Sequence, residues 1–335
     1  MSDSEALSTE LHSMLASGQL DLPPPGAGGT LGRLTALHEF GRRDLSIARL
    51  AEAHCDAAAI LAEAGRAPHP ASLYGVWASD GPSSQLLVKR AGRKVLLTGR
   101  KLYCSGACIT DRALVTAHEG GGVQLFDISP KAPGISMRSS GWVTPAFAAT
   151  CTWQVEFDEV EVEACDRVGA GNWYLERVGF WHGALGPAAC WAGGAAGLIA
   201  AALALPARDP HTRAQFGALE AARWSMQAAL NQASLEIDSQ PDALGPARQR
   251  AYVVRHLIER TCTEVLDRFG RATGPQLLAF DAGIARRYAE LTLYIRQCHA
   301  ERDLEKILSH SAADSGIRPL SRHGAEGSRH AGSPR

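Results

Sequence analysis

The sequence has no excess of charge of either sign, and this excludes several classes of function. Its 335 residues hold 34 Lys and Arg against 35 Asp and Glu, a formal net charge of −1. Proteins dedicated to nucleic acids or anionic membranes need a surplus of cations, because electrostatics drives their binding. We therefore expect no nucleic-acid partner. The apolar fraction of 45% is typical of a chain that folds around a core.

The eight cysteines lack the spacing of a metal or redox motif. No two of them form Cys-x-x-Cys, and Cys104 and Cys108 have neither a second pair nor a nearby His. This pattern favours buried thiols over a metal site. The first five residues carry acids and no basic, apolar signal. We expect no metal and a cytoplasmic location.

One stretch lacks charge altogether. Residues 178–207 contain no Asp, Glu, Lys or Arg, and this is long enough for a membrane helix. The run is mostly Ala and Gly, with Pro187 inside it, so its transfer into lipid is poor. Small residues let another backbone approach closely. We therefore expect a buried helix and no membrane span.

The first 68 residues carry a helical pattern. Leucines and a methionine recur at helical spacing near the N-terminus, before a turn rich in Pro and Gly. Thr30 is placed to cap a second helix, and Asp44 a longer third helix that stops near Gly65. We expect an N-terminal helical domain over residues 1–68.

Residues 69–168 carry β-strand patterns. Short runs rich in β-branched and aromatic residues alternate with Gly, Ser, Pro and Asp, at intervals too short for helices between them. The clearest run places Trp153, Val155 and Phe157 at alternate positions, with polar neighbours. We expect a middle antiparallel β-domain, as a sheet or a small barrel.

Beyond the β-domain the pattern returns to helix. A helix entered through Pro246 and left at Gly270 has an apolar face suited to a bundle. We expect a helical bundle over residues 169–310 and a disordered tail over 311–335, which is rich in Ser, Gly, Arg and His. The order α, β, α predicts an α+β fold. After the charge-free stretch, the predicted helices span residues 212–238, 246–269 and 281–308.

Taken together, these segments resemble the acyl-CoA dehydrogenase family of flavoproteins. Residues 97–107, LTGRKLYCSGA, look like a strand of the family's β-domain, and residues 151–162, CTWQVEFDEVEV, look like the strand that ends it. The resemblance covers residues 30–308. It implies the family fold: an N-terminal helical domain, here shortened, a middle β-domain and a C-terminal four-helix bundle around FAD.

The resemblance implies six flavin-binding positions in the β-domain. Tyr103 and Ser105 match the aromatic and hydroxyl pair that covers the flavin ring, and Ser83 falls where a Ser contacts a phosphate region. A planar ring system favours an aromatic wall with fixed polar donors at its edge. Aromatic residues also favour sheet interiors, so core packing is the alternative for them. The six positions are Tyr74, Val76, Trp77, Ser83, Tyr103 and Ser105.

The bundle departs further from the family pattern. Residues 268–274, RFGRATG, stand where family members have a glycine-rich loop for the adenosine half of FAD. Gly274 matches its last glycine. Arg271 replaces one of the paired glycines and adds a cation that can face a diphosphate. The resemblance therefore implies that Arg271 and Gly274 bind FAD.

No catalytic base is identified. Dehydrogenation of an acyl thioester needs a carboxylate that removes the α-proton while the flavin accepts hydride. The two family positions for this glutamate correspond here to residues 294–296, Tyr-Ile-Arg, and to Pro187. Glu301 and Asp303 follow the first position, but such charges are typical of a solvated helix face. His182 and His299 are more typical of structural roles.

Three functions follow from this resemblance. The main hypothesis is an acyl-CoA dehydrogenase-like oxidoreductase with FAD, acting on the CH–CH group of an acyl thioester or related substrate. It implies a homodimer or homotetramer, with an electron-transfer flavoprotein as partner. The first alternative is a flavin-dependent monooxygenase on the same scaffold, which does not need the missing glutamate. The second is a catalytically inactive subunit.

Overall fold

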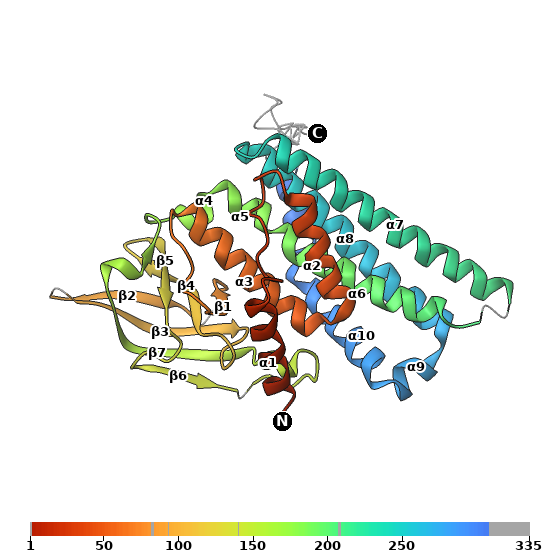
Figure 1. Ribbon diagram of the computed structural model, residues 1–335, viewed down its shortest axis with the longest axis horizontal. Helices are drawn as coiled ribbons and strands as arrows, with labels where there is room; N and C mark the ends of the chain where they lie inside the picture. The colour runs from red at the N-terminus through yellow and green to blue at the C-terminus, as the bar shows by residue number, and fades with distance from the viewer. Residues whose placement is uncertain (1, 82–83, 93, 140, 207–208, 308–335) are drawn as a thin grey trace, which may run out of the picture.

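Helices from both ends of the chain lie on one side of a single sheet built from its middle (Figure 1). The computed structural model describes residues 2–81, 84–92, 94–139, 141–206 and 209–307. The last N-terminal helix ends at Glu63, the first strand begins at Tyr74, and the last strand ends at Val168. This is the predicted order of helical, β and helical segments. The tail predicted at residues 311–335 lies outside the described residues.

The helices and strands have the following bounds. The α-helices are α1 (Asp3–Ala16), α2 (Thr30–Arg43), α3 (Leu45–Glu63), α4 (Trp173–Glu176), α5 (Val178–Gly183), α6 (Leu185–Leu203), α7 (Pro210–Ser239), α8 (Leu244–Thr273), α9 (Pro275–Phe280) and α10 (Ala282–Tyr294). The strands are β1 (Tyr74–Trp77), β2 (Leu86–Ala91), β3 (Lys94–Cys104), β4 (Arg112–Glu119), β5 (Gly122–Ile128), β6 (Ile135–Arg138), β7 (Trp153–Val162) and β8 (Arg167–Val168).

Side-chain caps fix where the N-terminal helices begin. Asp44 accepts hydrogen bonds from the backbone N–H groups of Ser46 and Ile47 and so begins α3, as predicted. The prediction that Thr30 caps α2 is wrong, because Thr30 is the first helical residue. The carboxylate of Asp238 on α7 takes that part instead. It accepts hydrogen bonds from the backbone N–H and the hydroxyl of Thr30.

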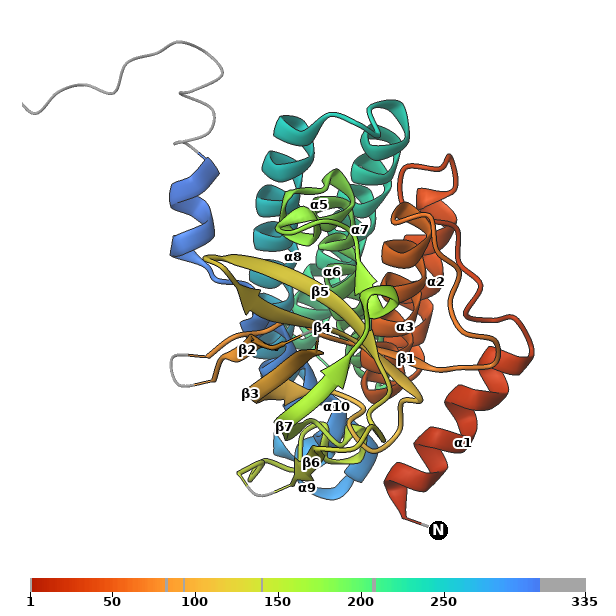
Figure 2. The same ribbon diagram turned by 90° about the vertical axis from the view of Figure 1, so that its left-hand side faces the viewer.

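The sheet faces the helices with one side (Figure 2). Its strands follow the order β6-β7-β3-β2-β4-β5-β8, and β1 pairs with β4 off this path. Most neighbours are antiparallel, as predicted, but β1 runs parallel to β4, and β2 meets β4 in parallel at Leu87 and His118. The predicted alternation holds in β7, where Val155 and Phe157 are buried. Strand β1 is the strand that packs on α3.

The charge-free stretch forms a core helix. In the window of α5 and α6 that is apolar enough to cross a membrane, 72% of the residues are buried inside the protein. A side chain at Gly193 of α6 would collide with the backbone of His38, and one at Gly41 of α2 with that of Cys190. These glycines let α2 and α6 approach closely. The prediction of a buried helix is confirmed.

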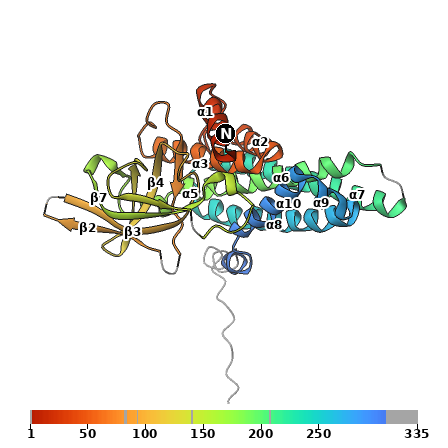
Figure 3. The same cartoon turned by 90° about the horizontal axis from the view of Figure 1, so that it is seen from below.

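Two boundaries predicted for the bundle are wrong. Helix α8 passes Gly270 and ends at Thr273, because the residue that takes a positive φ, of 66°, is Gly274. The helix predicted over residues 281–308 is interrupted. Helix α10 ends at Tyr294 in a 3₁₀ turn over Ile295–Gln297, and α-helical residues resume only at 301. Figure 3 shows the bundle on the opposite side of the N-terminal helices from the sheet.

The thiol predictions hold for Cys104 and fail for Cys108. Cys104 is a buried free thiol. Cys108 forms a disulfide with Cys151. The two loops that carry the disulfide are held together by backbone hydrogen bonds, which Gly106 and Ala107 donate to Thr150 and Cys151. The sequence separation of 43 residues concealed this contact.

Candidate functional site

A cavity of about 820 Å³ lies where the sheet, α3 and the bundle meet. We call it the junction cavity. Strand β1 contributes Val76, β3 contributes Tyr103, and α3 contributes Glu52. The opposite wall comes from α5, with Trp181, and α8, with Tyr252. The volume falls in the range of roughly 300–1,000 Å³ that small-molecule sites occupy.

Three of the predicted flavin positions line the junction cavity: Val76, Tyr103 and Ser105. Tyr103 is 58% exposed and takes a positive φ of 58°, which is costly for a residue with a side chain. Ser105 is held in place, because its Oγ accepts hydrogen bonds from Nε of Arg49 at 3.0 Å and from the hydroxyl of Thr152 at 3.1 Å. The turn after β3 therefore presents an aromatic ring and a fixed hydroxyl side by side.

Tyr74 and Trp77 lie in the protein interior instead. The hydroxyl of Tyr74 donates to Asp127 and accepts from the backbone of His69. Trp77 packs in the sheet core and donates its Nε1–H to the backbone oxygen of Ser105 at 3.0 Å. Neither side chain lines the junction cavity among its described residues. Both follow the alternative of core packing, and Trp77 also supports the loop that carries Ser105.

The remaining predicted positions are elsewhere or not described. Ser83 lies outside the described residues. Arg271 is 66% exposed and forms an ion pair with Asp267 on its own helix. The last residue of α8 that lines the cavity is Arg255. Arg271 lies sixteen positions farther along α8, which corresponds to about 24 Å of helix. Gly274 directly follows the last residue of α8.

The two family positions of the catalytic glutamate do lie at the junction cavity. Pro187 on α6 and Tyr294 at the end of α10 both line it. His299 and Asp303 line it as well, because the helix is interrupted after Tyr294. Asp303 accepts a hydrogen bond from the backbone N–H of His299. His182 donates from Nε2 to the backbone oxygen of Pro241 and serves a structural role.

Sequence reasoning missed Glu52 and Asp56 on α3, which line the cavity together with Asp303. Burial and the neighbouring Asp56 raise the pKa of Glu52 to about 8. Burial also raises the pKa of Asp56. The signal available in the sequence was their spacing. Glu52 and Asp56 are four residues apart on a largely apolar helix, so they share one face of it.

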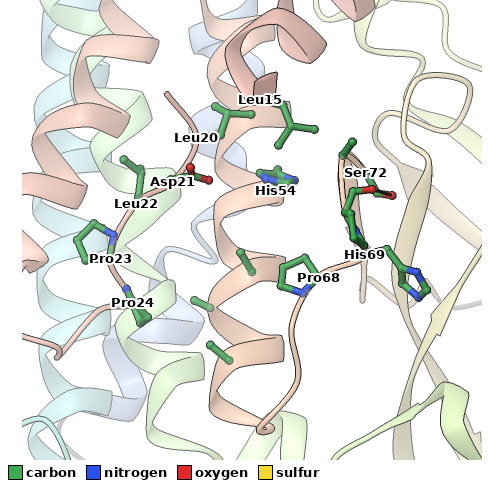
Figure 4. Close-up of a pocket in the computed structure, with 15 residues that line it drawn as sticks. Leu15, Leu20, Asp21, Leu22, Pro23, Pro24, His54, Pro68, His69 and Ser72 are labelled. Atoms are coloured by element: carbon green, nitrogen blue, oxygen red, sulfur yellow. Dashed lines mark hydrogen bonds between the residues drawn. The ribbon is translucent and has the colours of Figure 1, made fainter. Parts of the chain in front are cut away.

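A second cavity, of about 630 Å³, lies against the opposite face of α3. Figure 4 shows His54 at its centre, with Asp21 on one side and His69 and Ser72 on the other. Burial lowers the pKa of His54 to about 4, so its ring is neutral. Its Nδ1 accepts a hydrogen bond from the backbone N–H of Tyr74 at 3.1 Å. This histidine therefore ties α3 to β1.

No protein-family model matches the chain, and no curated protein sequence matches it. Solved structures match over nearly its whole length. Methanesulfinate monooxygenase MsuC from Pseudomonas fluorescens is 17% identical over 96% of this chain and 98% of its own, with a TM-score of 0.72. Dibenzothiophene monooxygenase TdsC from Paenibacillus sp. A11-2 is 15% identical over 93% and 96%, with a TM-score of 0.76.

A nitrososynthase from Micromonospora carbonacea var. africana is 17% identical over 92% of this chain and 94% of its own, with a TM-score of 0.77. TdsC has been solved with FMN and with indole. At these identities the likeness is one of fold. The chain has the acyl-CoA dehydrogenase-like α+β fold, with N-terminal helices, a central sheet and a C-terminal helical domain.

Proposed function

We propose that this chain is a flavin-dependent monooxygenase that uses FMN. One combination carries the proposal: Val76, Tyr103 and Ser105 line one cavity of a fold that TdsC shares, and TdsC binds FMN. The main hypothesis from the sequence was a dehydrogenase with FAD. The residues of the cavity favour its alternative, for the three reasons that follow.

The first reason is that the donor set suits a flavin ring. Tyr103 offers an exposed aromatic face, and planar aromatic systems favour such contacts. Ser105 and Arg49 place polar groups beside it. Across the cavity, the Nε1–H of Trp181 is buried with no hydrogen-bond partner among the described residues. Buried donors are normally paired, so this one is available to a ligand.

The second reason concerns the size of the cofactor. FAD differs from FMN by an adenosine monophosphate portion, which the family resemblance assigned to Arg271 and Gly274. In this chain about 24 Å of helix separates Arg271 from the cavity, which is several times the reach of an arginine side chain. Arg271 is also already paired with Asp267. A single chain therefore provides for the flavin ring without the adenosine portion.

The third reason is the protonation of the acids in the cavity. A dehydrogenase needs a carboxylate base, and neither Pro187 nor Tyr294 supplies one. Glu52 is an acid in this place, because its pKa of about 8 keeps it largely protonated at neutral pH. A bound reduced flavin supplies the electrons for oxygen activation. Without a cation beside it, Glu52 would hold a proton, and Phe147 and Phe180 would exclude water from the cavity.

The proposal is tested first by flavin binding. We expect the purified protein to bind FMN at least tenfold more tightly than FAD, measured by quenching of flavin fluorescence. Tyr103→Leu should weaken FMN binding by about tenfold, which corresponds to the loss of one aromatic contact. Trp224→Leu is the matched control, because Trp224 is a 71% exposed aromatic residue on α7, away from the cavity.

Reactivity separates the proposal from its rivals. The protein loaded with chemically reduced FMN should consume oxygen faster when indole is present, and octanoyl-CoA should leave the oxidised flavin yellow without oxygen. Bleaching by octanoyl-CoA would establish the dehydrogenase reading instead. Failure to bind either flavin would leave an inactive scaffold, the third hypothesis.

A further inference from the structure

Glu52 and Asp56 have no hydrogen-bond donor and no ion-pair partner within 4 Å in the part of the chain that the structure describes. This sets them apart from the other acids in the protein interior. Asp127 accepts from Arg112, and Glu290 accepts from Ser46. Both side chains are half-buried at the wall of the junction cavity, so they face whatever fills it. A pair that stays unpaired therefore indicates a ligand that completes it.

The neighbouring helix leaves room for these carboxyl groups. A Cβ at Gly186 of α6 would lie 2.6 Å from Oε1 of Glu52, and one at Gly183 of α5 would lie 2.7 Å from Oδ1 of Asp56. Any side chain at either position would displace the carboxyl group that faces it. The two glycines thus keep both acids at the cavity wall.

The arginines of the same cavity are engaged elsewhere. Arg49 donates to Ser105, and Arg177 donates to Glu63 at 2.5 Å. Arg255 donates to the backbone oxygens of Ala184 and Gln297. Among the described residues none of these guanidinium groups forms an ion pair with the two acids, although Nε of Arg177 is buried without a partner. These arginines lower the pKa values of Glu52 and Asp56 through their charge, without an ion pair to either acid.

An aromatic wall continues from the acid pair. Tyr174 and Phe180 have ring centroids 5.5 Å apart, Phe180 and Trp181 5.3 Å, and Trp181 and Tyr252 5.2 Å, all edge to face. All four line the junction cavity. Aromatic faces bind apolar groups and attract cations. The wall therefore suits a ligand that has a cationic head and an apolar body.

We propose that Glu52 and Asp56 bind the ammonium group of an amine substrate, whose apolar body lies against Phe180, Trp181 and Tyr252. An ammonium group has three N–H donors and no acceptor, which matches two acceptors that have no donor of their own. The inference rests on the proposed function, since it names the substrate class of the same cavity. A neutral substrate of equal shape leaves the pair unsatisfied and binds more weakly.

The inference also predicts how binding depends on pH. Glu52 must lose its proton to accept from the ammonium group, so amine affinity should rise from pH 6 to about pH 8 and then level off. Burial sets this behaviour first, and charged neighbours on several helices adjust it. The charged and titratable groups around the pair are Arg33, Arg49, Cys55, Glu63, Tyr174, Arg177, Cys190, Arg255 and Tyr294.

The experiment compares two probes of the same size on the full chain. Phenethylamine carries the ammonium group, and 2-phenylethanol replaces it with a neutral hydroxyl. Binding is measured by calorimetry, with and without FMN. We expect phenethylamine to bind at least tenfold more tightly at pH 8, and D56N and E52Q to remove that preference while binding of the alcohol stays unchanged. Glu220→Gln, on the exposed face of α7, is the matched control and should keep the preference.

Two results would overturn the inference. One is equal binding of the two probes to the unmodified chain, which needs no variant to fold. The other is an amine preference that survives in D56N and in E52Q. If FMN binds and indole still stimulates oxygen uptake, the monooxygenase proposal stands and only the amine assignment falls. If the chain prefers the amine but binds no flavin, the amine site stands and the monooxygenase proposal falls.

Discussion

The acids of the β-domain core and those of the junction cavity have opposite surroundings. In the β-domain Asp127 is fully buried and accepts hydrogen bonds from Nε of Arg112 at 2.7 Å and from the hydroxyl of Tyr74 at 3.2 Å. Arg66 adds a longer contact at 3.4 Å. At the junction cavity Glu52 and Asp56 have no such donors within the described ranges. The chain itself supplies hydrogen-bond donors to Asp127, whereas it supplies none to Glu52 and Asp56 among the described residues.

The difference separates stability from function. A buried acid that its own chain fully pairs contributes to a unique packed structure, and removing it leaves cations uncompensated. An acid that its own chain leaves unpaired lowers stability and is retained where a ligand completes it. Replacing Asp127 should therefore destabilise the protein, and replacing Glu52 should stabilise it.

The largest expected effect is that of Asp127→Ala. The substitution leaves Arg112 and Arg66 without their carboxylate and Tyr74 without its acceptor. Loss of one partner from a buried ion pair lowers the free energy of unfolding by roughly 3–5 kcal/mol. Urea unfolding followed by circular dichroism measures it.

The control for Asp127 is an exposed ion pair of the same sheet. Glu161 pairs with Lys94 at 2.7 Å, with both side chains more than half exposed. Glu161→Ala should change the free energy of unfolding by less than about 1 kcal/mol. Equal losses for the two variants would show that the Asp127 cluster has no special structural role.

The second largest effect is that of Glu52→Gln, which should raise the free energy of unfolding at high pH. The folded protein keeps the proton of Glu52 up to about pH 8, whereas the unfolded chain releases it above its ordinary pKa of 4.5. The contribution of Glu52 to the free energy of unfolding is therefore highest below pH 4.5. It falls as pH rises toward 8 and is constant above pH 8. The slope is on the order of 1 kcal/mol per pH unit.

Urea unfolding at intervals from pH 5 to pH 9 measures this slope. The E52Q variant should match the unmodified chain at pH 5 and exceed it at pH 8.5, so the difference between the two curves isolates Glu52. Glu220→Gln, whose carboxylate is exposed, should follow the unmodified chain throughout. A difference curve without slope would mean that Glu52 is ionised in the folded protein at neutral pH.

Sequence patterns were sufficient for the fold because its signals are local. The cap at Asp44, the alternation in β7 and the small residues of α6 each determine a neighbouring stretch of chain. The errors came where a distant residue decides. Thr30 is capped by Asp238, and Cys108 meets Cys151, and neither contact leaves a periodic trace in the sequence.

The candidate site was predictable only in part, for a related reason. Tyr103 and Ser105 belong to one turn, so a family resemblance in that turn locates both at the cavity. Tyr74 and Trp77 matched the same pattern but lie in the interior. Glu52 was missed because a charge on a helix indicates solvent exposure unless the packing around it is known.

The third effect is that of Tyr103→Gly. It tests whether Tyr103 contributes to FMN binding while its backbone strain lowers the free energy of unfolding. Tyr103 has a φ of 58° with its side chain 58% exposed, so it has little packing to offset the strain. Glycine relieves a strain of about 1–3 kcal/mol and loses part of that gain to chain entropy. We expect a net gain of about 1 kcal/mol in the free energy of unfolding and about tenfold weaker FMN binding.

Tyr103→Ala distinguishes the two contributions. Alanine removes the ring but keeps the Cβ and so keeps the strain. It should bind FMN as weakly as the glycine variant without its gain in stability. The same stability for both variants would show that the backbone at this position is not strained.

The smallest expected effect is that of Arg271→Ala. Arg271 and Asp267 form an exposed i,i+4 pair at 2.9 Å, which contributes about 0.3–0.5 kcal/mol to stability. Because about 24 Å of helix separates this residue from the junction cavity, FMN affinity should not change. The resemblance to acyl-CoA dehydrogenases instead placed this segment against FAD. Flavin titrations of the variant compare the two readings directly. A loss of FAD affinity of tenfold or more, with FMN affinity unchanged, would return the adenosine portion to Arg271 and make FAD a cofactor of this chain.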